Sequence, residues 1–444
     1  MSDMPESTEF VTRRERYLKE MGPGVAIVPA AEVAIRNNDV EHDYRQDSDL
    51  FYLTGFDEPE SVLLLTTEHK EHRSVVFVRK RDKDREIWDG PRAGVEGAKE
   101  RLGVDAAFPI EELEQRLPDY LGDVRRVHYR LARNREFDAV VFRALDAVRR
   151  KARSGVTAPS EIVDLTRDLH ELRLRKSEAE LEAMRKAATI SREAHLRAMQ
   201  VALPGHYEYE VEAEIMRVFR AHGAERPAYG SIVGSGPNAT ILHHRRNDRQ
   251  MRDGDLLLID AGAEYDYYAS DVTRTFPVNG RFSPAQAEIY QLVLDAQLAA
   301  IESVRPGIAY TAVHDVAVRV LTAGLVRLGL IEGPAEEAVE KERYKPFYMH
   351  RTSHWLGMDV HDVGDYYAEK RPRLLEPGMV LTVEPGLYIA TDAAVEERYR
   401  GIGVRIEDDI AVTAQGYRNL TSDIPKQVAE LERILAARTG HHQR

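Results

Sequence analysis

Two short segments of this chain repeat nearly the same pattern, and this repeat constrains the fold more than any other feature. Residues 254–262 read GDLLLIDAG and residues 378–386 read GMVLTVEPG. In each segment a glycine precedes a short apolar run, which is typical of a buried strand. Each run ends in a carboxylate, Asp260 in the first and Glu384 in the second. The chain therefore contains an internal duplication in which each half ends a strand with an acid.

A second acid follows each segment on a predicted partner strand: Asp271 within SDVTRTF and Glu407 within GVRIEDD. Two antiparallel strands joined by a short turn can point both carboxylates of one half at the same place. Burying a carboxylate beside apolar residues costs several kcal/mol unless it is paired, and converging carboxylates repel one another. Two divalent cations would offset that charge. The four acids therefore predict a carboxylate cage for metal ions, in preference to exposed turns or isolated ion pairs.

The composition restricts the remaining possibilities. A chain of 444 residues with 43% hydrophobic and 31% charged residues is typical of a globular protein with two domains. A formal net charge of −13 argues against nucleic acid or an anionic membrane as the partner. The chain has no cysteine, so any metal must be held by nitrogen and oxygen. The polar N-terminus lacks the pattern of a secretory signal and no apolar run is long enough for a membrane span, so we expect a cytoplasmic protein.

The pattern of apolar runs divides the chain into two predicted domains. In residues 1–172, short apolar runs alternate with helical stretches, which indicates an α/β domain. A helical pattern over 160–174 is expected to bridge to the second domain, residues 173–444. That domain opens at Ser177 with a capping box, and the order of two helices followed by a strand pair then occurs twice. The fold class is therefore α/β (α+β), with an internally duplicated second domain.

Residues 347–364 contain three histidines, His350, His354 and His361. Neutral imidazole is the commonest nitrogen ligand and acid/base group near neutral pH. The spacing lacks the glutamate of the HExxH zinc motif. Ligation dominated by carboxylates with a single histidine favours a hard ion such as Mn(II), with Fe(II), Co(II) and Zn(II) as alternatives.

Over its whole length the chain resembles aminopeptidase P, the Xaa-Pro aminopeptidase family of the pita-bread metallopeptidase superfamily, which also includes methionine aminopeptidase, prolidase and creatinase. The resemblance rests on residues 353–364 (SHWLGMDVHDVG), 383–389 (VEPGLYI) and 403–408 (GVRIED), and extends to 43–56 and 232–243. It implies an N-terminal α/β domain of the creatinase/prolidase type, which controls access and mediates oligomers. A C-terminal pita-bread domain with duplicated helix-helix-strand-pair halves would carry the site.

The same resemblance implies five metal ligands, namely Asp260, Asp271, His354, Glu384 and Glu407. Asp271 and Glu407 would bridge two divalent ions, for which we expect Mn(II). Asp260 would complete the coordination of one ion, and His354 with Glu384 that of the other.

Further active-site roles follow from the resemblance alone. Glu384 would take the proton of the attacking water, and His361 and His243 would hydrogen-bond the substrate and the tetrahedral intermediate. The residues that would shape the proline pocket and orient Glu407 are His350, Tyr388 and Arg405. Trp88 is a candidate for the rim of the cleft, although a tryptophan packed in a core or at a domain interface is an equal alternative.

The implied reaction is hydrolysis of the peptide bond between a free N-terminal residue and a penultimate proline. The nearest alternative is prolidase, the Xaa-Pro dipeptidase. This chain is distinguished from prolidase by the run Ser353-His354-Trp355 and by the upstream Tyr348-Met-His350. A creatinase-like amidinohydrolase or a binding protein on the same fold would lack some of the ligands that are present here. We expect peptides as partners, no nucleic acid or membrane, and a homodimer or homotetramer.

Overall fold

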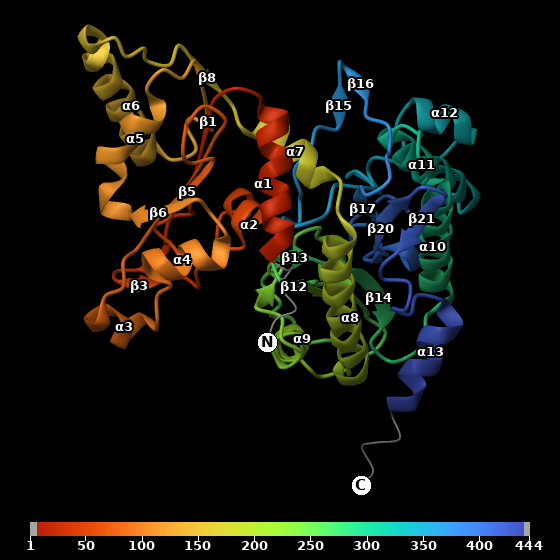
Figure 1. The fold of residues 1–444 in the computed structure, drawn as a ribbon. Helices are drawn as coiled ribbons and strands as arrows, with labels where there is room; N and C mark the ends of the chain where they lie inside the picture. The colour runs from red at the N-terminus through yellow and green to blue at the C-terminus, as the bar shows by residue number, and fades with distance from the viewer. Residues whose placement is uncertain (1–6, 439–444) are drawn as a thin grey trace. The chain divides into compact units, whose positions relative to one another are not determined.

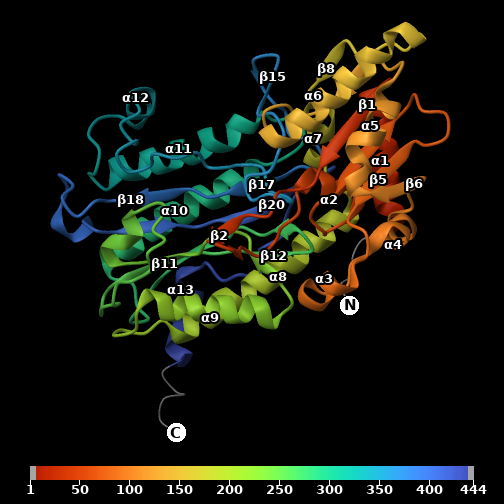
Figure 2. The same ribbon diagram turned by 90° about the vertical axis from the view of Figure 1, so that its left-hand side faces the viewer.

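The computed structural model describes residues 7–438 (Figures 1 and 2). The chain divides into two compact units between Arg173 and Leu174, and helices and strands are mixed in both. Within the described residues no helix combines the length and the apolar character needed to cross a membrane.

The first unit is built on a six-stranded mixed sheet in the order β6-β5-β4-β1-β7-β8. Strand β1 pairs antiparallel with β4 and parallel with β7, so the sheet continues on both sides of the first strand. Its elements in chain order are α1 (Ser7–Met21), β1 (Val25–Pro29), β2 (Ile35–Asn37), β3 (Val40–Glu41), α2 (Ser48–Thr54), β4 (Val62–Thr66), β5 (Ser74–Val78), α3 (Lys83–Asp89), α4 (Gly94–Leu102), β6 (Ala106–Pro109), α5 (Leu113–Leu121), β7 (Arg126–His128), α6 (Arg135–Arg150), β8 (Glu161–Val163) and α7 (Thr166–Leu174).

Helices cover both faces of this sheet because its strands are apolar on both faces. In β5, Val75 and Phe77 pack on the core formed with α5 and α6. Their neighbours Val76 and Val78 point to the opposite face and pack with α4. The alternation follows the two-residue period of a strand.

The second unit contains two helix pairs and two sets of strands, in the duplicated order expected from the sequence. Figures 1 and 2 show α8 beside α9 and α10 beside α11, as the two helix pairs of the repeat. The elements are α8 (Glu178–Val201), α9 (Glu208–Ala221), β9 (Arg226–Pro227), β10 (Ile232–Ser235), β11 (Leu256–Asp260), β12 (Ala263–Tyr265), β13 (Tyr268–Ala269), β14 (Thr273–Pro277), α10 (Pro284–Ser303), α11 (Tyr310–Arg327), α12 (Ala335–Glu340), β15 (Tyr367–Ala368), β16 (Arg371–Pro372), β17 (Val380–Val383), β18 (Gly386–Tyr388), β19 (Gly403–Arg405), β20 (Asp408–Thr413), β21 (Gly416–Asn419) and α13 (Val428–Ala437).

The helix starts follow the sequence signals. Ser177 and Ser283 each close a capping box, with Glu180 and Gln286, at the starts of α8 and α10. One expectation was wrong in part, because the predicted helix over 160–174 begins only at Thr166. The preceding residues form β8, whose pairing with β7 extends the sheet and overrides the local helical pattern.

The first acid-bearing pair is β11 and β14, which run antiparallel with Asp260 opposite Thr273. Asp271 lies just before β14, so both acids of this half come to the same end of the pair. The connection turns at Asp266 and Tyr267, which both have positive φ and close the β12–β13 hairpin.

The second pair, β17 and β20, repeats this arrangement with Val383 opposite Asp408. Glu384 directly follows β17 and Glu407 directly precedes β20, so this half also brings its two acids to one end. The halves join where the backbone N–H of Glu407 donates to the carbonyl of Thr273 at 3.1 Å. The strand registers therefore bring all four acids toward one place.

Candidate metal centre

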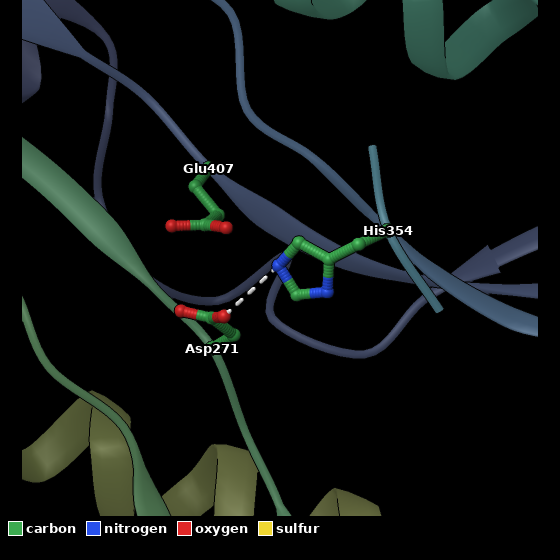
Figure 3. A group of neighbouring side chains, drawn as sticks. All are labelled: Asp271, His354 and Glu407. Atoms are coloured by element: carbon green, nitrogen blue, oxygen red, sulfur yellow. Dashed lines mark ion pairs between the residues drawn. The ribbon is translucent and has the colours of Figure 1, made fainter. Parts of the chain in front are cut away.

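Five side chains expected as ligands lie at strand ends or in the loop beside them. The ligand atoms of Asp271, His354 and Glu407 lie within 4.8 Å of one another, which is the geometry of a possible metal site among the described residues. Figure 3 shows the three side chains pointing toward one another. The Nε2 of His354 lies 3.3 Å from Asp271 and 3.5 Å from Glu384. The remaining acid, Asp260, joins the group through the hydroxyl of Tyr229.

Tyr229 links the two acids of the first half. Its hydroxyl oxygen lies 2.6 Å from the Oδ1 of Asp260 and 2.6 Å from the Oδ1 of Asp271, and shares its proton between them. Burial and the charges of these two carboxylates raise the pKa of the Tyr229 hydroxyl well above its usual value. The phenol therefore stays a proton donor and fixes the spacing of the two acids.

The local backbone sets which nitrogen of His354 faces the acids. The Nδ1–H donates to the carbonyl of Trp355 at 2.9 Å, so Nε2 is the nitrogen that faces the acids and that could bind a metal ion once it has lost its proton. The backbone N–H of His354 donates to the hydroxyl of Thr382 at 3.1 Å, which ties the histidine loop to β17. This is the arrangement expected of a metal-ligating histidine.

The charges of the site are poorly balanced without a cation. Burial, followed by the nearby carboxylates, raises the pKa of Glu407 well above its usual range. Burial also raises the pKa of Glu384 to about 7, against the influence of His354. Burial would lower the pKa of His354, but its hydrogen bond to Asp271 and the charge of Glu384 raise it to about 9. Because such a group of oxygen donors with one imidazole suits hard divalent ions, the residues present fit a metal centre.

Arg405 lies beside the acids on β19. Its Nη2 donates to Asp260 at 2.6 Å and its Nη1 to the hydroxyl of Tyr388 at 2.9 Å. Its Nε donates to the hydroxyl of Thr273 at 3.0 Å, and that hydroxyl donates to Glu407 at 2.6 Å. The guanidinium therefore orients acids of both halves.

His350 continues this chain of contacts. Its Nδ1–H donates to the carbonyl of Arg351 at 2.8 Å, so its Nε2 accepts from Tyr388 at 2.9 Å. Burial and the neighbouring Arg405 lower the pKa of His350 to about 3, which keeps the imidazole neutral.

Two further histidines approach the centre. The ring of His361 lies 4.5 Å from that of His354, centroid to centroid, and burial followed by His354 lowers its pKa. His243 is exposed, and its charge contributes to lowering the pKa values of both His350 and His361. His243 therefore lies near enough to His350 and His361 for its charge to act on both, while a role of the three histidines in contacting a substrate stays a prediction.

Trp88 lies in the other unit, on α3. Its side chain is 84% exposed, so the interpretation as a packed core tryptophan is wrong. A place on the rim of a cleft stays a prediction.

Sequence reasoning missed several residues that hold the ligands. Tyr229 and Thr273 carry no motif of their own, although Thr273 lies two residues after an expected ligand. Asp409 accepts hydrogen bonds from the backbone N–H of Asp271, at 3.2 Å, and from the hydroxyl of Ser270, at 2.8 Å. The run of three acids that begins at Glu407 was the one sequence signal for this support.

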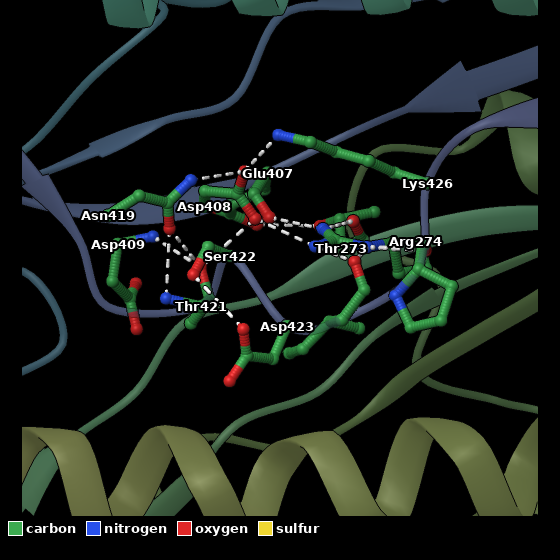
Figure 4. A network of polar contacts seen from close by, with 12 residues as sticks. Thr273, Arg274, Glu407, Asp408, Asp409, Asn419, Thr421, Ser422, Asp423 and Lys426 are labelled. Atoms are coloured by element: carbon green, nitrogen blue, oxygen red, sulfur yellow. Dashed lines mark hydrogen bonds and ion pairs between the residues drawn. The ribbon is translucent and has the colours of Figure 1, made fainter.

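Asp408 lies behind Glu407 in a buried polar network (Figure 4). Arg274 donates to Asp408 at 2.7 Å and to the backbone carbonyl of Glu407 at 2.6 Å. The other groups that contact the Asp408 carboxylate are Gln297, Asn419, Thr421 and Lys426. This network fixes the backbone from which Glu407 projects.

Known proteins match both units. The model of metallopeptidase family M24 matches residues 182–414, and that of the aminopeptidase P N-terminal domain matches residues 10–128. The Xaa-Pro aminopeptidase of Escherichia coli (strain K12) is 47% identical over 431 residues, which cover 97% of this chain and 98% of that protein. That of Haemophilus influenzae is 44% identical over 98% of both chains.

Solved structures agree with these matches. Pseudomonas aeruginosa aminopeptidase PepP superposes with a TM-score of 0.98 at 52% identity, covering 99% of this chain and 100% of that one. Zn-substituted E. coli aminopeptidase P in complex with product gives a TM-score of 0.95 at 46% identity, covering 98% and 99% of the two chains. The chain therefore belongs to metallopeptidase family M24 and, within it, to the Xaa-Pro aminopeptidases.

Proposed function

We propose that the protein is an Xaa-Pro aminopeptidase, which hydrolyses the bond between a free N-terminal residue and a penultimate proline. The observation that carries this proposal is the convergence of Asp271, His354 and Glu407, with Asp260 and Glu384 beside them, in a family of metallopeptidases. Proline has no N–H and a fixed φ, so peptidases that need that donor or an extended chain cleave before it poorly. A dedicated site is therefore physically reasonable.

Two divalent ions, with Mn(II) preferred, are the proposed cofactors. Four carboxylates and one imidazole form a hard donor set, which supports Mn(II) over a thiophilic ion, with Fe(II), Co(II) and Zn(II) as alternatives. Such ions, when bound, lower the pKa of a water and polarise the scissile carbonyl. The residues that would hold these ions are Asp260, Asp271, His354, Glu384 and Glu407.

The protein's own residues complete the reaction. Glu384 accepts the proton of the attacking water, which is a role that a carboxylate beside the attacking water can take. The water oxygen bonds to the carbonyl carbon, the bond from that carbon to the proline nitrogen breaks, and the proton passes to that nitrogen. His243 and His361 hydrogen-bond the substrate and the tetrahedral intermediate. His350 and Tyr388 line the proline pocket, while Arg405 orients the acids.

The first unit is proposed to control access and to mediate a homodimer or homotetramer. Ile87 and Trp88 on α3 are 80% and 84% exposed, which supports a contact with another copy of the chain. A cytoplasmic location belongs to the same proposal. Size-exclusion chromatography with light scattering tests the assembly, and cell fractionation tests the location.

The deciding experiment compares Arg-Pro-Pro with the dipeptide Ala-Pro as substrates. Chelator-treated protein is assayed with and without added Mn(II), and release of the first residue is followed by chromatography. We expect metal-dependent release of arginine from the tripeptide. Cleavage of the dipeptide alone would instead make the protein a prolidase, and activity on neither with any of the four metals would refute the proposal.

A further inference from the structure

The loop that carries His243 is fastened by one buried carboxylate, that of Glu208. Glu208 is the first residue of α9 and its side chain is fully buried. Its Oε1 accepts from the backbone N–H of Ser235, at 2.6 Å, and from the hydroxyl of the same residue, at 2.7 Å. Its Oε2 accepts from His244 at 3.0 Å and from the backbone N–H of Arg249 at 3.1 Å. Asn238 donates to both oxygens, at 3.1 and 3.3 Å.

These donors all belong to one loop of the chain, residues 235–249. Ser235 ends β10, Asn238 lies in the following turn of 3₁₀ helix (Gly236–Thr240), and Arg249 closes the loop. The carbonyl of Arg249 in turn accepts from the backbone N–H of Glu208 at 3.0 Å. One carboxylate thus ties the start, the middle and the end of the loop to the N-terminus of α9.

A helix start does not require such a residue. A helix N-terminus is normally capped by a short polar side chain that bonds its own first turn, and an acid there usually faces solvent. Glu208 instead loses all its hydration, which costs several kcal/mol unless the donors replace it. Its donors come from residues that follow it by 27 to 41 positions. The arrangement therefore serves the loop more than the helix.

His243 is the exposed residue between two anchored neighbours. His244 is buried against Glu208, and Leu242 packs with the cluster that contains Ala239 and Tyr388. Asn247 fixes the same loop from the other side, because it exchanges hydrogen bonds with the backbone of residues 231 and 233. The imidazole of His243 is thus presented from a backbone that is held on both sides.

We propose that Glu208 is a positioning residue for His243, acting through His244 and the loop backbone. This inference rests on the proposed function, in which His243 contacts the substrate. Glu208 touches none of the five expected ligands, so its contribution is to the geometry of substrate contact and not to metal binding. A displacement of about 1 Å at a contact residue costs on the order of 100-fold in rate.

The test is the variant Glu208→Gln in the full chain with Mn(II). Glutamine keeps the shape, but its amide nitrogen cannot accept from the donors that face one of the carboxylate oxygens. We expect kcat/KM for Arg-Pro-Pro to fall on the order of 10- to 100-fold. The relative changes in kcat and in KM should match those of the variant His243→Ala. In the double variant with His243→Ala, the Glu208 change should have almost no further effect, within about twofold. Mn(II) affinity should match that of the unmodified protein.

A second readout is independent of activity. Amide hydrogen exchange of Glu208→Gln should rise over residues 235–249, where two amides donate directly to the carboxylate, and stay unchanged over 256–260. If Glu208→Gln does not fold, Asn238→Ala, which removes one donor and keeps the charge, should give a smaller change of the same kind. Asp49→Asn in the first unit is the matched control, since it removes a buried carboxylate bound by Arg173 and His170. It should lower stability without this exchange pattern.

The outcomes separate the two proposals. An unmodified protein that cleaves no peptide refutes the proposed function, whatever the variants do. If the unmodified protein is active, two results would overturn the role of Glu208. One is a Glu208→Gln variant that keeps full kcat/KM, and the other is a double variant in which the losses of the two single variants multiply. A fall in Mn(II) affinity equal to the fall in activity would also overturn it.

Discussion

The Nη2 of Arg405 lies 2.6 Å from the Oδ2 of Asp260, and this contact places a fixed positive charge against the first acid of the cage. Both side chains are largely buried. Their separation in sequence is large, so the contact depends on β19 lying beside β14, where the hydroxyl of Thr275 donates to the carbonyl of Arg405 at 3.0 Å.

We expect Arg405→Met to destabilise the metal-free protein more than the metal-loaded protein. Removing one partner of a buried pair leaves an uncompensated charge and costs about 3–5 kcal/mol. A bound cation would neutralise Asp260 and recover part of this loss. Urea unfolding of both proteins, with chelator and with saturating Mn(II), measures the difference. Equal destabilisation in the two conditions would contradict the idea that Arg405 and the metal both neutralise the negative charge of Asp260.

Tyr229→Phe removes the hydroxyl that spans Asp260 and Asp271. Residues that orient ligands typically contribute 10- to 100-fold in metal affinity or activity, and we expect a loss of that order in Mn(II) affinity. Calorimetric titration of chelator-treated protein measures it. Tyr268→Phe is the matched control, because that buried hydroxyl donates to Glu180 at 2.8 Å instead. The same loss in both variants would show that the effect is one of packing.

The convergence of the four acids was predictable because they belong to a repeated pattern, whereas His354 and the assignment of five metal ligands came only from the resemblance. The strand-end acids Asp260 and Glu384 follow from period and burial alone, and the registers of their strands then confirm the common end. Tyr229 could not be predicted in this way, because its contact depends on how the segment before β10 folds back over the first strand pair. Glu208 is a second example, since only the folded loop shows where its donors lie.

In the first unit the local sequence pattern predicted the wrong secondary structure for one segment. Residues 161–163 carry a helical pattern, but pairing with β7 satisfies their backbone as an edge strand. Asp164 then ends the strand by accepting from the backbone N–H of Thr166 at 2.9 Å, at the start of α7. Such tertiary pairing is invisible in a single sequence.

The stabilisation given by Mn(II) should increase from pH 5 to pH 8. Burial raises the pKa of Glu384 to about 7 in the metal-free fold, above the pKa that this carboxyl has in the unfolded chain. Between these two pKa values the carboxyl destabilises the fold progressively as the pH rises. The pKa of His354, raised to about 9, gives a stabilising contribution that is complete below about 6.5 and is lost as the pH rises through 9. Both changes weaken the metal-free protein as the pH rises.

Thermal unfolding with and without Mn(II) across this range measures the difference in Tm. Metal ions also bind deprotonated ligands more tightly, which acts in the same direction. Glu384→Gln should flatten the pH dependence of the metal-free Tm. A shift in Tm that is constant with pH would contradict the assignment of the titrating groups to the cage.

Asp408 supports the site from behind, and its removal should affect stability more than any exposed acid nearby. Asp408→Asn leaves Arg274 buried without its carboxylate partner, and we expect a loss of about 3–5 kcal/mol in the free energy of unfolding. Lys426→Met should cost less, because Arg274 still neutralises Asp408 in that variant. The control is Asp423→Asn, an exposed residue beside the same network, which should stay within about 0.5 kcal/mol. Urea unfolding in saturating Mn(II) measures the free energy of unfolding of all three variants. A loss in Asp408→Asn no larger than that of the control would mean that the polar network of Figure 4 does not stabilise the fold.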